Sequence, residues 1–570
     1  MAVIVDGKLV FAVEEERFTR HRHSPGEFPT NSLLEAFAFL KGLGIGPGDV
    51  EAFALNYDPK LKLFSESMHL LRGTASAVGS PVTSALRSID AFVLRKCHSM
   101  LRRAYSISGN SPPDKINIVP VAHHLAHAAS AHYFSGFSSS SVLTADGLGE
   151  VASTVVWKAK NGEFEAISSV NAWEGSLGIL YERVCQALGF DFLSGPGKVM
   201  GLAPYGRNME KLSTRFDQII RFNVLDGPYA FSRRFGFASG RHTWGPMYAR
   251  LIKFLTSGFD LSWNPRRELE PNPSALALAA QHFIENAMLR TAEWTKAQTG
   301  SDKLLLAGGV ALNAKANMKL HYSKLFSDIF VFPAAADQGA CVGAAAYVYE
   351  HTCGGKMSHG RLARIDFGPQ YDDDSVKSTV REAKYPAEFV GDDFTRIAEL
   401  LAKGKVVGWF QGRSEFGPRA LGNRSLIADP RRKDNWSKLN VIKGRESWRP
   451  VCPSLLSSDK DDYFEDPVDH EFMVMMFRMK ADARERVPAV CHVDSTSRPQ
   501  TVERNANPTW YDLIRSFKEA TGEGMLINTS FNLAGEPLVR TPEQALRDFA
   551  IGGLDALYLQ GHLIEKPLSG

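Results

Sequence analysis

The chain lacks an excess of charge of either sign. Its 570 residues include 66 lysines and arginines against 63 aspartates and glutamates, which leaves a formal net charge of +3. Proteins that bind nucleic acid through its phosphates usually carry a strong basic excess or a basic stripe. The near balance therefore argues against nucleic acid as a partner.

Cysteine is scarce and scattered, and no two cysteines form a C-x-x-C pair. The six residues are Cys97, Cys185, Cys341, Cys353, Cys452 and Cys491. This spacing argues against a zinc motif and against a disulfide framework. We expect buried or incidental thiols in a reducing compartment.

Long apolar runs and leader features are also missing. No stretch reaches the length of a membrane span, and no signal-peptide pattern opens the sequence. We therefore expect a cytoplasmic protein that has no membrane partner.

The length exceeds one ordinary hydrophobic core, so at least two domains are expected. Strands followed by helices recur in the first part, which predicts an α/β domain. The region from Gly354 to Tyr371 is polar and rich in glycine, as is typical of a boundary. We predict domains over residues 1–355 and 370–570.

The first residues predict a β-hairpin followed by a charged run. Two apolar runs in residues 2–18 are joined by Asp6-Gly7, a dipeptide typical of hairpin turns. After acidic residues 14–16 comes a basic group. Its members are Arg17, Arg20, His21, Arg22 and His23. Such a run is usually a solvated face, and phosphate contacts are the alternative.

Two histidines four residues apart stand in the Ala-rich stretch HHLAHAASA. On a helix this spacing places His123 and His127 on one face. Asp146 directly follows a predicted strand over residues 141–144, where α/β sheets bind ligands. The three side chains suit a divalent metal, and a solvated helix with incidental histidines is the alternative. Asp337 follows a second strand, over residues 329–331, and is expected to face Asp146.

Two glycine-rich stretches suit nucleotide binding. Residues 194–206, SGPGKVMGLAPYG, predict a loop in which Lys198 adds positive charge, although the P-loop pattern is not matched. Gly308 and Gly309 follow a very apolar strand over residues 303–307 and allow close approach of the backbone to a ligand. Asn313 is placed to hydrogen-bond that ligand.

The second domain carries many basic residues between glycines and prolines. Arginines on rigid turns suit the recognition of phosphate or carboxylate groups, and a charged surface is the alternative. The residues are Arg413, Arg419, Arg424, Lys443, Arg445, Arg449 and Arg498. Asn528, Ser530 and Asn532 follow a strand and suit a small polar substrate.

These motifs occur in one order over nearly the whole chain. They read HHLAHAASA, TADG, GKVMGLAPYG, GGVALN, ADQGA, QGRSEFGPRALGNRS, IKGRESWRP, DSTSRPQTV and INTSFN. The chain resembles the O-carbamoyltransferase family of nodulation protein U, cephamycin carbamoyltransferase and nebramycin 5′ synthase. The resemblance implies an α/β domain of the duplicated actin/sugar-kinase type, similar to Kae1 (Kae1-like). It also implies an α+β domain similar to YrdC (YrdC-like).

The resemblance further implies a reaction in two steps. In the YrdC-like domain, ATP and carbamoyl phosphate give carbamoyl-adenylate, phosphate and pyrophosphate. In the Kae1-like domain, the carbamoyl group passes to a hydroxyl of a small-molecule acceptor, such as a sugar or an antibiotic-type natural product, and AMP leaves.

The resemblance assigns roles to most of the candidate residues. Arg419, Lys443, Arg449 and Arg498 would be catalytic and offset substrate charge, while Ser530, Asn532, Asn528 and Arg424 would bind substrate. Lys198, Gly308, Gly309 and Asn313 would bind nucleotide. His123, His127, Asp146 and Asp337 would hold the metal, for which the resemblance suggests Fe(II) and the ligand types also allow Mn or Mg.

The chain departs from the family pattern at its start. Family members have a strand and a turn with a His-Asp pair before the segment that matches residues 2–7. We expect this difference to reflect the choice of start site. No residue is assigned as the base of the transfer step.

Three other functions remain open at this stage. They are a tRNA-modifying enzyme that makes threonylcarbamoyl-adenosine, a hydrogenase-maturation carbamoyltransferase, and a non-catalytic nucleotide-binding regulator. The balanced charge argues against the first, and the missing C-x-x-C pairs argue against the second. We expect a monomer or homodimer, with residues 60–110 and 226–265 as walls of the acceptor pocket.

Overall fold

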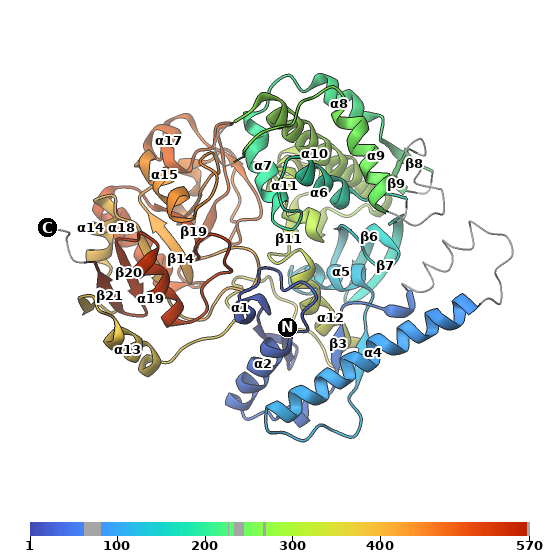
Figure 1. Cartoon of the computed structure of the whole chain (residues 1–570), viewed down its shortest axis with the longest axis horizontal. Coiled ribbons are helices and arrows are strands. Elements are labelled where there is room, and N and C mark those ends of the chain that lie inside the picture. The colour runs from blue at the N-terminus through green and yellow to red at the C-terminus, as the bar shows by residue number, and fades with distance from the viewer. Residues whose placement is uncertain (62–80, 173, 226, 233–243, 266–268, 567–570) are drawn as a thin grey trace. The chain divides into compact units, whose positions relative to one another are not determined.

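The computed structural model describes residues 1–61, 81–172, 174–225, 227–232, 244–265 and 269–566, which form two compact units of helices and sheets (Figure 1). Unit 1 comprises Met1–Ala12, Phe28–Trp263 and Glu270–Leu362. Unit 2 comprises Val13–Glu27, Asn264–Leu269 and Ala363–Gly570. The fold is therefore mixed α/β, with several sheets.

Unit 1 contains a five-stranded sheet in the order β11-β10-β5-β6-β7. The strands are β5 (Ser139–Ala145), β6 (Ala152–Lys160), β7 (Glu163–Asn171), β10 (Lys303–Ala307) and β11 (Asp328–Val331). β5, β10 and β11 run parallel, which suits their apolar sequences because parallel strands are covered on both faces. The predicted strands are confirmed, and the carboxyl ends of these three lie at one edge.

Helices α5 (His123–Tyr133) and α12 (Asp337–His351) pack tightly against each other in unit 1. A Cβ atom on Gly343 of α12 would overlap the carbonyl oxygen of Ala126 on α5. The small residues of both helices thus serve close packing, which fixes the relative positions of His123, His127 and Asp337. The helix predicted from HHLAHAASA is confirmed.

The predicted loop over residues 194–206 is wrong. This stretch forms helix α7 (Gly195–Leu202) and a 3-10 turn over Ala203–Tyr205. A Cβ on Gly195 would lie 2.7 Å from Cβ of Cys185, and a Cβ on Gly206 would overlap the carbonyl of Ser274. These two glycines are required for close packing between elements. The pattern of glycines in the sequence does not distinguish this role from that of a phosphate-binding loop.

Other elements of unit 1 surround this core. The predicted hairpin is confirmed as β1 (Ala2–Val5) and β2 (Lys8–Ala12), with Asp6 and Gly7 at positive φ. Its further strands are β3 (Phe53–Leu55), β4 (Ile118–Pro120), β8 (Ile220–Val224) and β9 (Gly227–Phe231). Its further helices are α2 (Thr30–Gly42), α4 (Pro81–Ile107), α6 (Leu177–Ala187), α8 (Glu210–Asp217), α9 (Trp244–Thr256), α10 (Pro271–Thr299) and α11 (Ala314–Ser323).

The two expected walls of the acceptor pocket are described only in part. Helix α4 occupies much of residues 60–110, and residues 62–80 lie outside the described ranges. Within residues 226–265, position 226 and residues 233–243 lie outside them too. The expectation about these walls stays a prediction.

Unit 2 is built on an eight-stranded sheet in the order β12-β21-β20-β13-β14-β19-β15-β18. The strands are β12 (Ala387–Phe389), β13 (Val407–Phe410), β14 (Arg424–Ala428), β15 (Cys452–Leu456), β18 (Gln500–Val502), β19 (Met525–Ser530), β20 (Ala556–Leu559) and β21 (His562–Glu565). Trp409, Trp510 and Tyr558 are fully or almost fully buried in its core, with Trp409 and Tyr558 stacked at 4.1 Å.

The register of this sheet brings distant parts of the sequence to one edge. Ser425 pairs with Ser530, Cys452 with Asn528, and Ser454 with Gln500. The starts of β14, β15 and β18 and the end of β19 therefore lie together. Extending the register of β15 and β18 by two residues places Arg498 opposite Cys452.

Eight helices of unit 2 are described together with a small two-stranded sheet. They are α1 (Glu16–Thr19), α13 (Asp373–Glu382), α14 (Thr395–Ala402), α15 (Lys433–Ile442), α16 (Lys460–Tyr463), α17 (Ala481–Arg486), α18 (Pro508–Thr521) and α19 (Pro542–Ile551), with strands β16 (Phe477–Arg478) and β17 (Thr496–Ser497). All six cysteines are free. Within the described ranges, no helix combines the length and apolar character needed to cross a bilayer.

Candidate functional site

Four side chains converge at the carboxyl edge of the unit 1 sheet. Helix α5 supplies His123 and His127, the end of β5 leads to Asp146, and α12 begins at Asp337. Nε2 of His127 lies 2.9 Å from Oδ2 of Asp146, and Nε2 of His123 lies 3.3 Å from the same oxygen. Oδ1 of Asp337 is 3.6 Å from Nε2 of His123. All four ligand atoms lie within 4.8 Å of one another.

The electrostatics of this cluster favour a cation. His127 is fully buried, which disfavours its charged form, yet Asp146 and Asp337 outweigh burial and raise its pKa to about 9. Burial opposes the charge of Asp146 as well, but hydrogen bonds from His123 and His127 hold its pKa well below the usual range. The two carboxylates thus stabilise a positive charge at the Nε2 atoms of the two imidazole rings.

The donor set fits a divalent metal. The two Nε2 atoms lie 3.1 Å apart, so their lone pairs repel unless a proton or a cation lies between them. Two imidazoles and two carboxylates suit borderline metals such as Fe(II), Mn and Zn. Glu150 accepts the backbone N–H of His123 at 3.1 Å and so fixes the start of α5. Asp337 is 76 % exposed and leaves one side of the cluster accessible.

Glu182 on α6 is a neighbour of this cluster that sequence reasoning missed. Burial, followed by the charges of Asp146 and Asp337, raises its pKa to about 7. No motif singles it out, because a glutamate within an amphipathic helix is ordinary.

The four residues predicted to bind nucleotide have different surroundings. A Cβ on Gly308, at φ +89°, would overlap the carbonyl of Ala145, and a Cβ on Gly309 would lie 3.0 Å from Oδ1 of Asp146. Both glycines thus adjoin the metal cluster. The side chain of Asn313 instead exchanges hydrogen bonds with Gln281 and caps α11. The ammonium of Lys198 lies on α7, 5.3 Å from the ring of Phe190.

In unit 2 a lysine is held by two of the predicted polar residues. Nζ of Lys443, the residue after α15, donates to the carbonyl of Ser530 at 2.6 Å and to Oδ1 of Asn532 at 2.9 Å. Oγ of Ser530 donates to Oδ1 of Asn532 at 2.6 Å. These three residues form one hydrogen-bonded group at the end of β19.

Two arginines, Arg445 and Arg449, act electrostatically on Lys443, and two more, Arg419 and Arg498, act on these arginines or on each other. Burial and then Arg498 lower the pKa of Arg419 to about 9, while burial and then Arg449 lower that of Arg445 to about 9. Nη2 of Arg498 donates to Sγ of Cys452 at 3.1 Å, in agreement with the sheet register that places these two residues opposite each other. Burial, Arg445 and Arg449 lower the pKa of Lys443 far below its usual value. We call Lys443 and these four arginines the cationic cluster.

Glu446 lies 3.6 Å from Arg449 and offsets part of this charge. Sequence reasoning placed Arg445 in the basic stretch without assigning it a role, and its spacing of two from Lys443 gives no signal of a shared site.

Two predicted substrate residues use their polar side chains within the protein. Arg424 is fully buried, and its guanidinium lies 3.5 Å from the centre of the Phe410 ring. The same guanidinium donates hydrogen bonds to the carbonyls of Gln411, Gly412 and Asn423. The amide of Asn528 donates to the carbonyl of Ala420 and to Oγ of Ser454. The backbone and neighbouring side chains thus use the groups that were expected to bind substrate.

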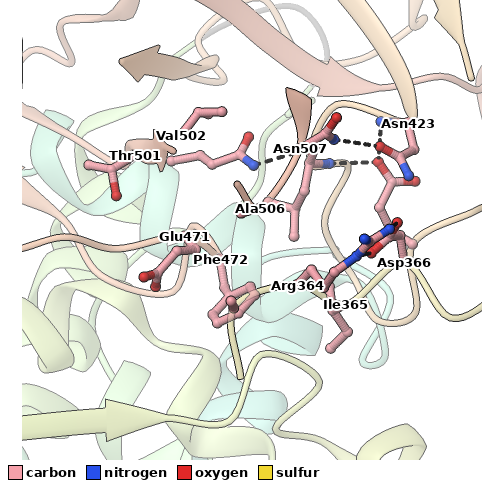
Figure 2. A pocket seen from close by; sticks show the side chains of 14 residues that line it. Arg364, Ile365, Asp366, Asn423, Glu471, Phe472, Thr501, Val502, Ala506 and Asn507 are labelled. Carbon is pink, nitrogen blue, oxygen red and sulfur yellow. Dashed lines mark hydrogen bonds and ion pairs between the residues drawn. The ribbon is translucent and has the colours of Figure 1, made fainter. Parts of the chain in front are cut away.

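A small recess that is partly open to solvent is lined by Glu415, Leu421 and Asn423, which flank Arg419 in the sequence. Figure 2 shows Asn423 and Asn507 at one side of it, joined by a 2.8 Å hydrogen bond. Oε1 of Glu415 accepts the backbone N–H groups of Leu421 and Asn423, each at 2.8 Å. This network fixes residues 415–423, and the recess is lined by none of the predicted site residues.

Comparison with known proteins gives a consistent result. Residues 1–346 match the family described as carbamoyltransferase N-terminus, and residues 398–566 match carbamoyltransferase C-terminus. An uncharacterized protein of Synechocystis sp. is 33% identical, over 99% of this chain and 94% of its own. Nodulation protein NolNO of Sinorhizobium fredii is 33% identical, over 99% and 78%. A crystal structure of full-length HypF is 14% identical over 44% of this chain and 45% of its own, with a TM-score of 0.23, too low to support an argument.

Proposed function

Because the chain belongs to the carbamoyltransferase family, we propose that it is an ATP-dependent O-carbamoyltransferase that acts through carbamoyl-adenylate. The observation that carries this proposal is the cationic cluster around Lys443, Ser530 and Asn532. The charged forms of these five basic side chains are disfavoured by burial and by mutual repulsion in the free protein, and a polyanionic substrate would stabilise them.

The first step belongs to unit 2, for which we propose the YrdC-like fold. Water cleaves carbamoyl phosphate into carbamate and inorganic phosphate. An oxygen of carbamate then attacks the α-phosphorus of ATP, carbamoyl-adenylate forms, and pyrophosphate leaves. Arg419, Arg449 and Arg498 are suited to binding the phosphate oxygens and to stabilising the charge that develops on them.

Lys443, Ser530 and Asn532 are suited to orienting the small carbamoyl end. Their hydrogen bonds hold Nζ of Lys443 beside Oγ of Ser530 and Oδ1 of Asn532, which are the kinds of acceptor that suit an NH₂ group. Arg424 and Asn528, whose polar groups bind the protein itself, support the strands that carry these residues.

The second step belongs to unit 1, for which we propose the Kae1-like fold. The acceptor hydroxyl attacks the carbamoyl carbon, the bond to the AMP oxygen breaks, and the hydroxyl proton is lost. A divalent metal at His123, His127, Asp146 and Asp337 would supply positive charge that stabilises AMP as leaving group. Gly308 and Gly309 lie against Ala145 and Asp146, which suits contact of their backbone with a nucleotide bound beside this metal.

Pyrophosphate release from ATP and carbamoyl phosphate, without any acceptor, tests this division. We expect release by the intact chain and by His123→Ala, and its loss in Arg498→Ala. Transfer to an acceptor should be lost in both variants. Absence of release from the folded intact chain would contradict the proposal, and a requirement for threonine would instead indicate the threonylcarbamoyl pathway.

A further inference from the structure

The segment Val13–Glu27 belongs to unit 2, although the residues on both sides of it in the sequence belong to unit 1. It contains α1 and the basic run from Arg17 to His23, which the proposed function leaves without a role. Arg20, His23 and Ser24 have φ values of 61°, 65° and 39°. Non-glycine residues adopt this left-handed conformation at an energetic cost, and such residues concentrate at functional sites.

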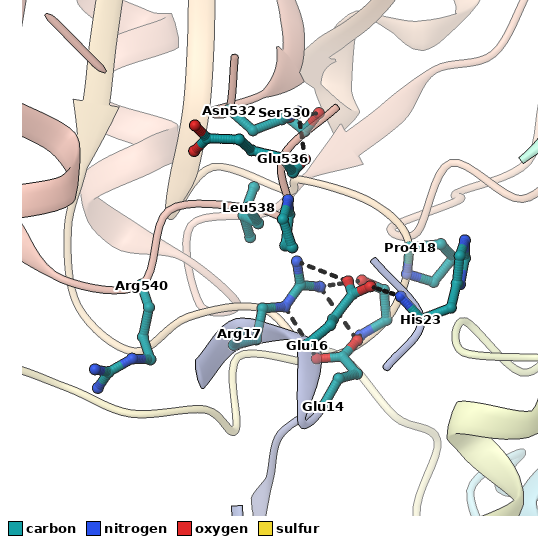
Figure 3. Close-up of polar contacts among 12 residues, drawn as sticks. Glu14, Glu16, Arg17, His23, Pro418, Ser530, Asn532, Glu536, Leu538 and Arg540 are labelled. Atoms are coloured by element: carbon teal, nitrogen blue, oxygen red, sulfur yellow. Dashed lines mark hydrogen bonds and ion pairs between the residues drawn. The ribbon is translucent and has the colours of Figure 1, made fainter. Parts of the chain in front are cut away.

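One end of this segment is bound to the loop that carries Arg419. Oε1 of Glu14 accepts the N–H of Gly417 at 2.6 Å, and Nη2 of Arg17 donates to the carbonyl of the same residue at 3.0 Å. Arg17 is 5% exposed and pairs with Glu14 and Glu16, as Figure 3 shows. Figure 3 also shows His23 beside Pro418. The segment therefore fixes the backbone directly before Arg419.

The same segment is bound to the loop that follows β19. Nη1 of Arg20 donates to the carbonyl of Leu538 at 2.6 Å, and its Nη2 donates to that of Pro537 at 2.8 Å. The carbonyl of the neighbouring Glu536 accepts from Nδ2 of Asn532 at 2.9 Å. Arg20 thus stabilises the loop that positions Asn532, which in turn binds Lys443.

Arg22 is exposed and follows Arg20, the second of these anchors, by two residues. Burial and then Arg445 are the main causes of the low pKa of Lys443, and the charge of Arg22 contributes further. The charge of Arg22 acts in the same direction on Arg449. Holding one more cation beside this cluster is unfavourable in the free protein, and it becomes favourable when a polyanion occupies the site.

We propose that Arg22 binds a phosphate group of the substrates in unit 2, and that Arg17 and Arg20 are positioning residues that hold Arg22 and the two site loops in place. This inference rests on the proposed function. The phosphate belongs either to carbamoyl phosphate or to the polyphosphate of ATP, and the two sources share the same chemistry.

Steady-state pyrophosphate release by the full chain tests the role of Arg22. We expect Arg22→Ala to raise the KM of one substrate about ten- to a hundredfold, because hydrogen bonds to charged groups contribute on that scale. The value of kcat should be largely retained, and Arg22→Lys should recover part of the loss. Arg381→Ala, an exposed arginine on α13, is the matched control and should leave both KM values unchanged.

The substrate whose KM rises identifies the source of the phosphate. Unchanged KM values for both substrates would overturn the inference, and so would a fall in kcat that Arg22→Lys does not reverse, since that indicates a purely structural role. If the intact chain releases no pyrophosphate, the proposed function fails on its own. In that case, calorimetry measures the affinity of inorganic pyrophosphate for the intact chain and for Arg22→Ala. Equal affinities would overturn the role of Arg22.

Discussion

Nε2 of His123 lies 3.1 Å from Nε2 of His127, and both nitrogens face Oδ2 of Asp146. Two imidazole nitrogens at this distance repel each other unless a proton or a metal ion lies between them. A proton fills this role in the metal-free protein, which agrees with the pKa of about 9 for His127. Protons and metal therefore compete for the same position.

Asp337→Asn tests the metal site with little disturbance of the fold, because this side chain is 76% exposed. We expect metal affinity to fall at least about tenfold, the loss seen when even an outer-shell partner is removed. Isothermal calorimetry with Mn²⁺ or Fe²⁺ measures this. Asp217→Asn, an exposed carboxylate in the same unit, is the control and should retain the affinity. Equal affinities for the two variants would exclude Asp337 as a ligand.

The metal-free protein should lose stability as the pH rises. The pKa of His127 is raised from 6.5 to about 9, so its contribution to folding is complete below pH 6.5 and is lost as the pH passes 9. Thermal unfolding in the presence of a chelator should therefore show a falling Tm between pH 6.5 and 9. His127→Gln should abolish most of this slope, and a slope unchanged by the substitution would place its origin elsewhere.

The site in unit 1 was predictable from the sequence where the spacing of ligand-type residues matches the repeat of a helix or the end of a strand. His123 and His127 are spaced for one face of a helix, and Asp146 ends a strand, so their meeting could be foreseen. The same reasoning failed for residues 194–206. A glycine needed for close packing and a glycine needed for phosphate approach look alike in sequence, and the packing partner of Gly206 at Ser274 is 68 residues away.

Gly343→Ala should weaken metal binding from a distance. The added methyl group would overlap the carbonyl of Ala126 and force α5 and α12 apart, which moves His123 and His127 relative to Asp337. We expect a lower Tm and a lower affinity for Mn²⁺. Gly197→Ala is the control, because this glycine lies in helix α7 with no atom within 4 Å of the added group. It should be neutral or stabilising by about 0.5–1 kcal/mol.

In unit 2, amino-acid composition predicted the type of site but not the role of each residue. The basic stretch predicted an anion site, and the structure brings Arg419, Lys443 and Arg498 to one edge of the sheet. The assignment of individual residues depended on information that the sequence does not hold. Arg22 and Lys443 are separated by hundreds of residues, whereas Arg424, only five residues from Arg419, faces backbone carbonyls.

Arg424 should therefore be a structural residue, although its motif suggested substrate binding. Arg424→Ala leaves three buried carbonyls without their donor and creates a cavity beside Phe410. We expect a loss of about 3 kcal/mol or more in the free energy of unfolding, measured with denaturant. Arg396→Ala, which removes an exposed ion pair with Glu565, should cost less than about 1 kcal/mol. An Arg424 variant with normal stability and a raised KM for carbamoyl phosphate would restore the role in substrate binding.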